Sequence, residues 1–85
     1  MSCSTIMAIV QENRTETAIH VQDVLTKYGC HIRVRLGLND SSVDQCSNRG
    51  MILLQLCGEG LELEEFEKEL KAIGNVKVKH MTVEF

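Results

Sequence analysis

A helix, a glycine and an alternating strand follow one another twice in this chain of 85 residues. The first copy places Gly29 before residues 32–35, and the second places Gly74 before residues 76–79. Each copy is preceded by an apolar run and then by an amphipathic segment, so the chain consists of two strand–helix–strand units in series. This order predicts an α+β fold, a ferredoxin-like βαββαβ sandwich with a four-stranded antiparallel sheet and two helices on one face.

The length and the hydrophobic content of 44% suffice for one domain with one core. We expect that domain over residues 1–85, with a short tail at residues 1–4 and a long polar loop at residues 39–50. The apolar runs at residues 5–11 and 51–57 are the expected central strands, because right-handed crossovers place the first and third strands in the middle of such a sheet.

The charge and the aromatic content exclude some classes of protein. A net charge of −3 with one tyrosine and two phenylalanines is unlike a dedicated nucleic-acid binder, which carries a basic excess and stacking rings. We therefore expect no direct contact with nucleic acid. Residues 1–4 lack a basic stretch followed by an apolar core, so we expect neither a signal peptide nor a membrane span, and a cytoplasmic location.

The four cysteines are scattered, without a C-x-x-C pair that would indicate a zinc ribbon or a thioredoxin-type site. In a reducing cytoplasm we expect free thiols, some of them buried as small apolar side chains.

The strand patterns predict which side chains face the helices. Ile32, Val34 and Leu36 alternate with charged residues, so we expect these three to face the helices and the charged set to face outward. In the last strand the apolar phase changes after Val78, which predicts a bulge near residues 79–80 or an end that turns its apolar side towards a partner.

The central strands are apolar on both sides, yet a single helical layer covers only one side of a sheet. The uncovered side would expose an apolar patch with a basic rim, and exposed patches of that size mark interfaces. We expect a homodimer or tetramer formed through the sheet, with the rim either pairing with acidic residues of a second subunit or binding an anion. The candidate interface or anion-binding residues are Met7, Ile9, Arg33, Arg35, Lys77, Lys79, Met81, Val83 and Phe85.

Enzymatic chemistry finds little support, and we predict no catalytic residue and no cofactor. Arg14 in the turn after the first strand invites comparison with acylphosphatases, where an arginine in a glycine-rich loop holds phosphate. Residues 11–14 contain no glycine, and Glu12 would repel an anion.

Metal binding is the stronger chemical alternative. His31, Cys46 and His80 would converge if the long loop folded back on the sheet, and imidazole with thiolate suits nickel, copper or zinc. The competing interpretation is that the histidines are polar residues near strand ends and Cys46 is a loop thiol.

The pattern resembles a known family. Gly29 before Ile-Arg-Val-Arg-Leu-Gly at residues 32–37, the apolar third strand, and Ile73-Gly74 before residues 75–79 resemble the small ACT-like proteins described as iron-only hydrogenase system regulators. The resemblance spans about residues 6–83 and rests on strand pattern and a few glycine and arginine positions.

That family is similar in fold to the carboxy-terminal domain of the nickel-responsive regulator, which associates through its sheets and binds nickel by histidines on the second strand. Arg33 and Arg35 occupy those positions here, so the resemblance does not extend to a nickel site. The similarity to ACT domains implies an amino-acid pocket at a subunit interface, although residues 12–15 lack the glycine expected there. The expected function is a non-enzymatic, oligomeric regulatory or sensor domain with a possible small-molecule effector. A nickel-type metal sensor and, more weakly, an acylphosphatase-like enzyme remain as alternatives.

Overall fold

The structure is a computed structural model that describes residues 3–39, 49–57 and 61–83. Its elements in chain order are β1 (Thr5–Gln11), α1 (Arg14–Lys27), the 3-10 turn η1 (Gly29–His31), β2 (Ile32–Asn39), β3 (Gly50–Leu56), α2 (Leu63–Lys71) and β4 (Val76–Thr82).

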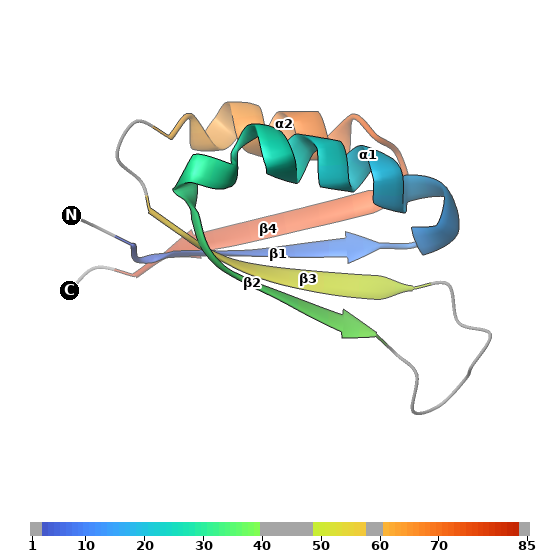
Figure 1. Cartoon of the computed structure of the whole chain (residues 1–85), viewed down its shortest axis with the longest axis horizontal. Coiled ribbons are helices and arrows are strands. Elements are labelled where there is room, and N and C mark those ends of the chain that lie inside the picture. Colours follow the sequence, from blue (N-terminus) through green and yellow to red (C-terminus); the bar gives the residue numbers. More distant parts are fainter. Residues whose placement is uncertain (1–2, 40–48, 58–60, 84–85) are drawn as a thin grey trace.

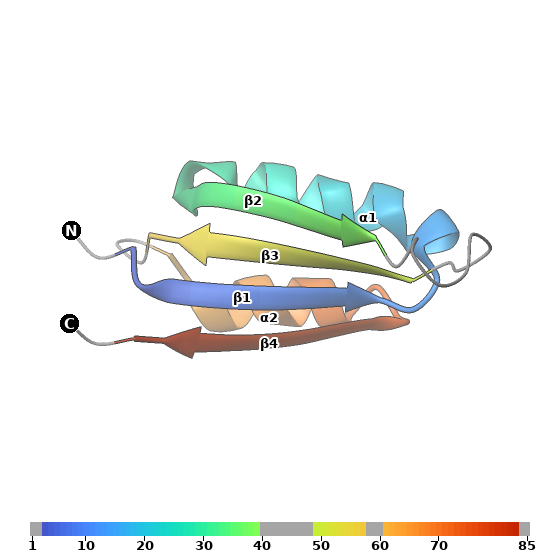
Figure 2. The same ribbon diagram turned by 90° about the horizontal axis from the view of Figure 1, so that it is seen from below.

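The fold has two layers. The four strands form one antiparallel sheet in the order β2-β3-β1-β4, and both helices lie on the same face of it (Figure 1). Seen from below, towards the face of the sheet that carries no helices, the strands lie in front and the helices behind them (Figure 2). The predicted ferredoxin-like βαββαβ architecture is therefore confirmed, with the first and third strands at the centre.

The core lies between the sheet and the helices. Met7 and Ile9 on β1 are fully buried there, together with Leu54 on β3 and Phe66 on α2. α1 contributes Val21 and Leu25, which lie one turn apart and so share one face of the helix. Apolar residues at helical spacing in the helices and at strand spacing in the sheet thus pack into one cluster, as the sequence pattern predicts.

The end of α1 is attached to α2 by a set of polar and aromatic contacts. The Tyr28 ring stacks on the Phe66 ring with centroids 4.4 Å apart, and its hydroxyl donates a hydrogen bond to Glu69. Lys27 Nζ lies 2.9 Å from Glu69 Oε1 and 5.6 Å from the Tyr28 ring centroid. These contacts fix the two helices beside each other over the core.

The predicted orientation of the second strand is wrong, because a bulge changes its phase. Ile32 pairs with Leu56 and Val34 pairs with Gln55, so Arg33 is an extra residue in β2. An extra residue moves every following side chain to the other face of the sheet. Ile32 therefore packs against the core, whereas Val34 and the apolar residues after it face away from the helices.

Of the two alternatives predicted for the last strand, the bulge near residues 79–80 is wrong. β4 pairs with β1 without a break, from Thr82 opposite Thr5 to Val76 opposite Gln11. Val76 and Val78 are buried under the helices. Met81 lies an odd number of residues further along the strand, so its side chain is on the other face of the sheet and points away from the helices. The change of apolar phase therefore reflects a change of face along a regular strand.

The glycines after the two helices have different roles. Gly74 has φ 85° and is followed by Asn75 with φ 57°, so the turn into β4 uses the left-handed region that favours glycine. Gly29 lies instead in the short 3-10 turn that leads into β2. The two copies of the sequence pattern thus end their helices by different backbone routes.

The expectation of free thiols is wrong for two cysteines. Cys3 and Cys57 form a disulfide that joins the start of β1 to the end of β3. These positions are adjacent because Thr5 pairs with Leu56, which brings residues 54 apart in sequence to one end of the sheet. Cys30 is free and exposed, and Cys46 lies outside the described residues.

In the described part of the chain, neither helix is long and apolar enough to cross a membrane.

Candidate functional site: the open sheet face and the pocket beside it

The face of the sheet turned away from the helices, here called the open face, carries most of the exposed large apolar side chains among the described residues. Alternation along each strand and the pairing registers assign side chains to it. Its residues are Ile6, Ala8 and Val10 on β1, Val34, Leu36 and Leu38 on β2, Met51, Leu53 and Gln55 on β3, and Lys77, Lys79 and Met81 on β4, with Val83 just beyond.

Much of this apolar surface is in contact with solvent. The large hydrophobic side chains Ile6, Val34, Leu36, Leu38, Met51, Met81 and Val83 are between 38% and 60% exposed. The two lysines lie together on the edge strand β4, and Lys77 Nζ is 3.3 Å from Glu12 Oε1. Exposed apolar patches of this kind are typical of interaction surfaces.

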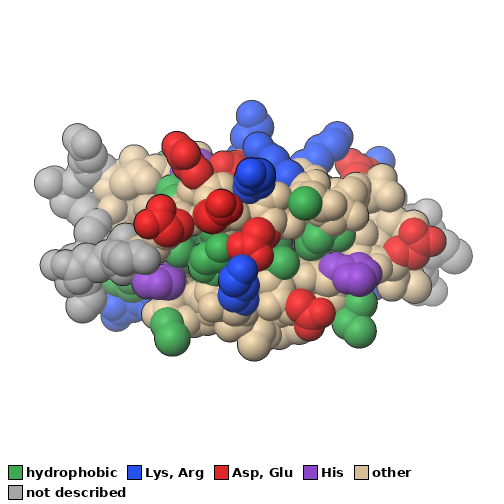
Figure 3. Space-filling view, turned by 90° about the horizontal axis from the view of Figure 1, so that it is seen from above, with side chains coloured by type: hydrophobic (Ala, Val, Ile, Leu, Met, Phe, Trp, Pro, Cys, Tyr) green, Lys and Arg blue, Asp and Glu red, His purple; other side chains and the backbone are tan. Residues whose placement is uncertain are grey.

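The opposite face of the molecule is different in kind. Seen from above the helices, it carries many acidic and basic side chains, with apolar areas visible between them (Figure 3). Apart from Ile19 on α1, the exposed large apolar side chains among the described residues lie on the open face.

Some predicted interface residues lie elsewhere. Met7 and Ile9 were assigned to the open face, but both are completely buried under the helices. β1 is apolar at every position from Ile6 to Val10, so sequence alone does not distinguish its two faces. Arg35 is also on the helix side of the sheet, opposite Leu54, because of the bulge at Arg33.

The remaining predicted residues divide into three groups. Lys77, Lys79 and Met81 belong to the open face, and Val83 extends it. Arg33 is the exposed extra residue of the bulge. Phe85 lies outside the described residues.

The two histidines of the alternative metal site are not brought together. His31 precedes the edge strand β2, whereas His80 lies on β4 at the other edge, three strand spacings or roughly 14 Å across the sheet. His80 Nδ1 lies 3.2 Å from Glu67 Oε2, and Cys46 lies outside the described residues. Within the described ranges, no three His, Cys, Asp or Glu side chains form a group suited to a metal ion.

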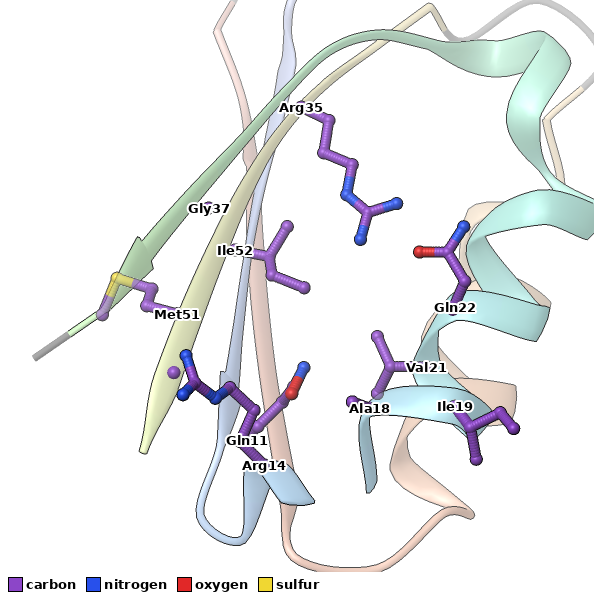
Figure 4. A pocket seen from close by; sticks show the side chains of 11 residues that line it. Gln11, Arg14, Ala18, Ile19, Val21, Gln22, Arg35, Gly37, Met51 and Ile52 are labelled. Atoms are coloured by element: carbon purple, nitrogen blue, oxygen red, sulfur yellow. The ribbon is translucent and has the colours of Figure 1, made fainter. Parts of the chain in front are cut away.

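A pocket of about 400 Å³ lies on the helix side of the sheet, between α1 and the β2–β3 edge (Figure 4). α1 lies over β2, and the two elements diverge towards the end of the strand (Figures 1 and 2). Small residues keep the space open. Ala18 faces it from α1, and a Cβ added to Gly37 on β2 would meet no atom within 4 Å.

Polar and cationic groups surround an apolar wall in this pocket. Arg35 enters it from β2, and Arg14, the first residue of α1, lies near its lower end in Figure 4. Val21 and Ile52 form the wall between them. Arg14 thus lines a pocket beside α1, a setting unlike the glycine-rich phosphate loop considered for it above.

Two glutamines add hydrogen-bonding groups to the pocket. Gln22 donates from Nε2 to Thr26 Oγ1 at 3.3 Å, and Figure 4 shows its carbonyl oxygen directed into the pocket. Gln11 is 3% exposed, and its Oε1 has no hydrogen-bond partner among the described residues. A buried polar atom without a partner is uncommon in folded proteins and calls for an explanation.

The sequence pattern predicts neither this pocket nor the position of Val34, Leu36 and Leu38 on the open face. The alternation in the sequence predicts Val34 and Leu36 on the covered side, because a one-residue bulge leaves no clear mark in the sequence, and it makes no prediction for Leu38. A signal did exist for the pocket, since a glycine inside a strand such as Gly37 often marks close approach or space for a ligand.

The only altered pKa values resolved among the described residues belong to the contact between the helices. The hydrogen bond to Glu69 raises the pKa of Tyr28 to about 12, with smaller contributions from burial and from nearby carboxylates. The same bond, together with Lys27, lowers the pKa of Glu69. This contact lies outside both the open face and the pocket, and it stabilises the helical layer.

Comparison with known proteins adds a likeness at the level of the fold. No family model matches the chain, and no curated protein matches it. The solved structure of the uncharacterized protein TM1266 from Thermotoga maritima is similar, with a TM-score of 0.73, 22% identity, and coverage of 94% of this chain and 95% of that one. At this level of identity, the likeness shows a shared fold over nearly the whole chain.

Proposed function

We propose that this chain is a non-enzymatic regulatory domain that acts as a homodimer formed through the open face. The carrying observation is the exposure of seven large apolar side chains on one face of a sheet whose other face packs the hydrophobic core against the helices. The resemblance of the sequence pattern to ACT-like iron-only hydrogenase system regulators, which are regulatory proteins, supports the same role.

The area of the open face favours a second copy of the same chain as its partner. Four strands about 4.8 Å apart and about seven residues long, at roughly 3.3 Å per residue, outline about 440 Å². Two such faces give on the order of 900 Å² in outline, and side-chain relief brings the total near the lower range of stable interfaces at about 1,200 Å². An interface of this size forms only if the partner covers the whole open face, as the open face of a second copy would do.

The charges on the open face favour one arrangement of the two copies. Lys77 and Lys79 lie on the edge strand β4, and the opposite edge strand β2 offers Leu36 and Leu38. A twofold axis parallel to the strands places β4 of one copy over β2 of the other, so the lysine rows are kept apart. The lysine stems can then lie along apolar side chains while their ammonium groups reach solvent.

The test is the oligomeric state of matched charge variants. Light scattering on the purified chain at micromolar concentration should give a dimer. Leu53→Glu places a carboxylate on the central strand β3, in the middle of the proposed contact and away from the lysines of β4, and should weaken association at least about a hundredfold, because an unpaired buried charge is strongly unfavourable. Ile19→Glu makes the same change at an exposed position on α1, which is 67% exposed, and should remain dimeric.

Two results would contradict the proposal. One is a monomer of the unmodified chain even at high concentration. The other is equal association of the Leu53→Glu and Ile19→Glu variants, since the open face would then have no special part in association. Circular dichroism of both variants separates loss of association from loss of fold.

A further inference from the structure

The pocket between α1 and the β2–β3 edge has the features of a small-molecule site. Its volume of about 400 Å³ lies in the range of ligand pockets, and it combines an apolar wall with a few convergent polar groups. The space exists because Ala18 and Gly37 carry almost no side chain where the helix and the strand face each other.

The charge in the pocket selects an anion. Arg35 is exposed in the pocket, and no carboxylate among the described residues forms an ion pair with it. A guanidinium group presents its donors in a planar fork that matches a carboxylate in two parallel hydrogen bonds. Arg14 adds positive charge at the other end. An ammonium group on the ligand would be repelled by this field.

The remaining groups specify the rest of the ligand. Because Nε2 of Gln22 is directed to Thr26, its carbonyl oxygen is the part that faces the pocket and can accept a hydrogen bond. Val21 and Ile52 offer an apolar wall between Arg35 and Arg14 (Figure 4). A ligand that satisfies all three features has a carboxylate, a neutral donor close to it and a short alkyl chain.

We infer that this pocket binds a short aliphatic 2-hydroxy carboxylate. Its carboxylate lies on Arg35, its hydroxyl donates to the carbonyl oxygen of Gln22, and its alkyl chain lies against Val21 and Ile52. Such a ligand would be the effector of the regulatory domain proposed above, and the inference rests on that proposal for this role alone. Binding itself is decided by the pocket, which lies on the other side of the sheet from the open face.

Calorimetric titration of the full chain with four probes tests the inference. We expect 2-hydroxybutyrate to bind more tightly than butyrate, which lacks the donor, and more tightly than 2-aminobutyrate, which carries an ammonium group. Inorganic phosphate should bind more weakly than either carboxylate without an ammonium group, because it makes no use of the apolar wall. Equal affinity for phosphate and 2-hydroxybutyrate, or no binding of 2-hydroxybutyrate, would overturn the assignment.

Variants of the pocket make the test specific. Arg35→Gln should weaken the binding of 2-hydroxybutyrate at least about tenfold, because the charge-assisted pair is lost. Gly37→Val should abolish binding by filling the space, and the strand tolerates it since the φ of Gly37 lies outside the left-handed region and a Cβ there meets free space. Lys79→Gln removes the same charge from the open face and should leave the affinity unchanged.

Light scattering on the same samples separates this inference from the proposed dimer. Arg35→Gln and Gly37→Val alter the helix side of the sheet, so both should associate like the unmodified chain. A dimer that binds no 2-hydroxybutyrate overturns the pocket assignment alone. An affinity that falls equally in Arg35→Gln and Lys79→Gln would also overturn it, because the effect would then be one of overall charge.

Discussion

The two faces of the sheet are made by the same strands, but they meet opposite environments. On β1, Met7 and Ile9 are fully buried under the helices, while Ile6 on the other face is 40% exposed. On β3, Leu54 is buried and Met51 is among the exposed apolar residues. The comparison teaches that hydrophobicity along a strand does not reveal which side is covered, since both sides carry large apolar residues.

The largest expected effect separates a residue of the covered face from one of the open face. Leu54→Ala removes a side chain that is 1% exposed and should lower the free energy of unfolding by roughly 2 to 5 kcal/mol, through lost burial and the cavity left behind. Because such a domain has a total stability of about 5 to 15 kcal/mol, much of its stability would be lost.

Leu36→Ala is the matched control on the open face. Urea unfolding at a concentration low enough to favour the monomer should show a loss of less than about 1 kcal/mol, because the side chain is already half exposed. Equal losses in the two variants would mean that the covered and open faces have been assigned wrongly.

The sequence predicted the fold well because the pattern at each level agrees with it. Helical spacing of apolar residues such as Val21 and Leu25, and the apolar runs of β1 and β3, all require one helical layer on one sheet. Element order and chain length then leave few topologies, and the observed strand order is the expected one.

The faces and the candidate sites were less predictable for physical reasons. A single extra residue at Arg33 reverses the side of β2 on which Val34 and Arg35 lie, and the bulge depends on pairing with β3. The disulfide depends on the register of β1 and β3, which brings Cys3 beside Cys57. The pocket depends on how α1 lies over the twisted sheet beside β2 and β3, and no local sequence pattern specifies that arrangement.

A second expected effect concerns the contact that holds the helices over the covered face. The pKa of Tyr28 is raised to about 12, above its ordinary value of 10.0, so the protonated hydroxyl is favoured in the folded chain. Its contribution to stability is therefore complete below pH 10 and is lost as the pH rises towards about 12.

The chain contains one tyrosine, so the ultraviolet absorbance of tyrosinate reports this group alone. We expect a titration midpoint near pH 12 in the folded chain, displaced towards 10 in Glu69→Gln. For Glu69 the dependence of stability on pH has the opposite sign. Its pKa is lowered from 4.5, so its contribution is present above that value and is lost as the pH falls through the lowered pKa. A midpoint near 10 in the unmodified chain would contradict the contact.

The smallest expected effect decides what drives association of the open face. If the basic rim paired with acidic residues of a second copy, raising the salt to about 1 M, where the Debye length is about 3 Å, would strongly weaken the dimer. Lys77 already lies 3.3 Å from Glu12 of its own chain, and exposed ion pairs contribute only about 0 to 1 kcal/mol. Burial of apolar side chains does not depend on screening, and the net charge of −3 on each copy opposes association at low salt. Sedimentation equilibrium should therefore show that added salt changes the dissociation constant of the dimer by less than about tenfold. Any change should be a decrease, because salt screens the repulsion between the two negatively charged copies. A dimer that dissociates on addition of salt would show that the lysine rim, and not the apolar centre of the open face, holds the two copies together.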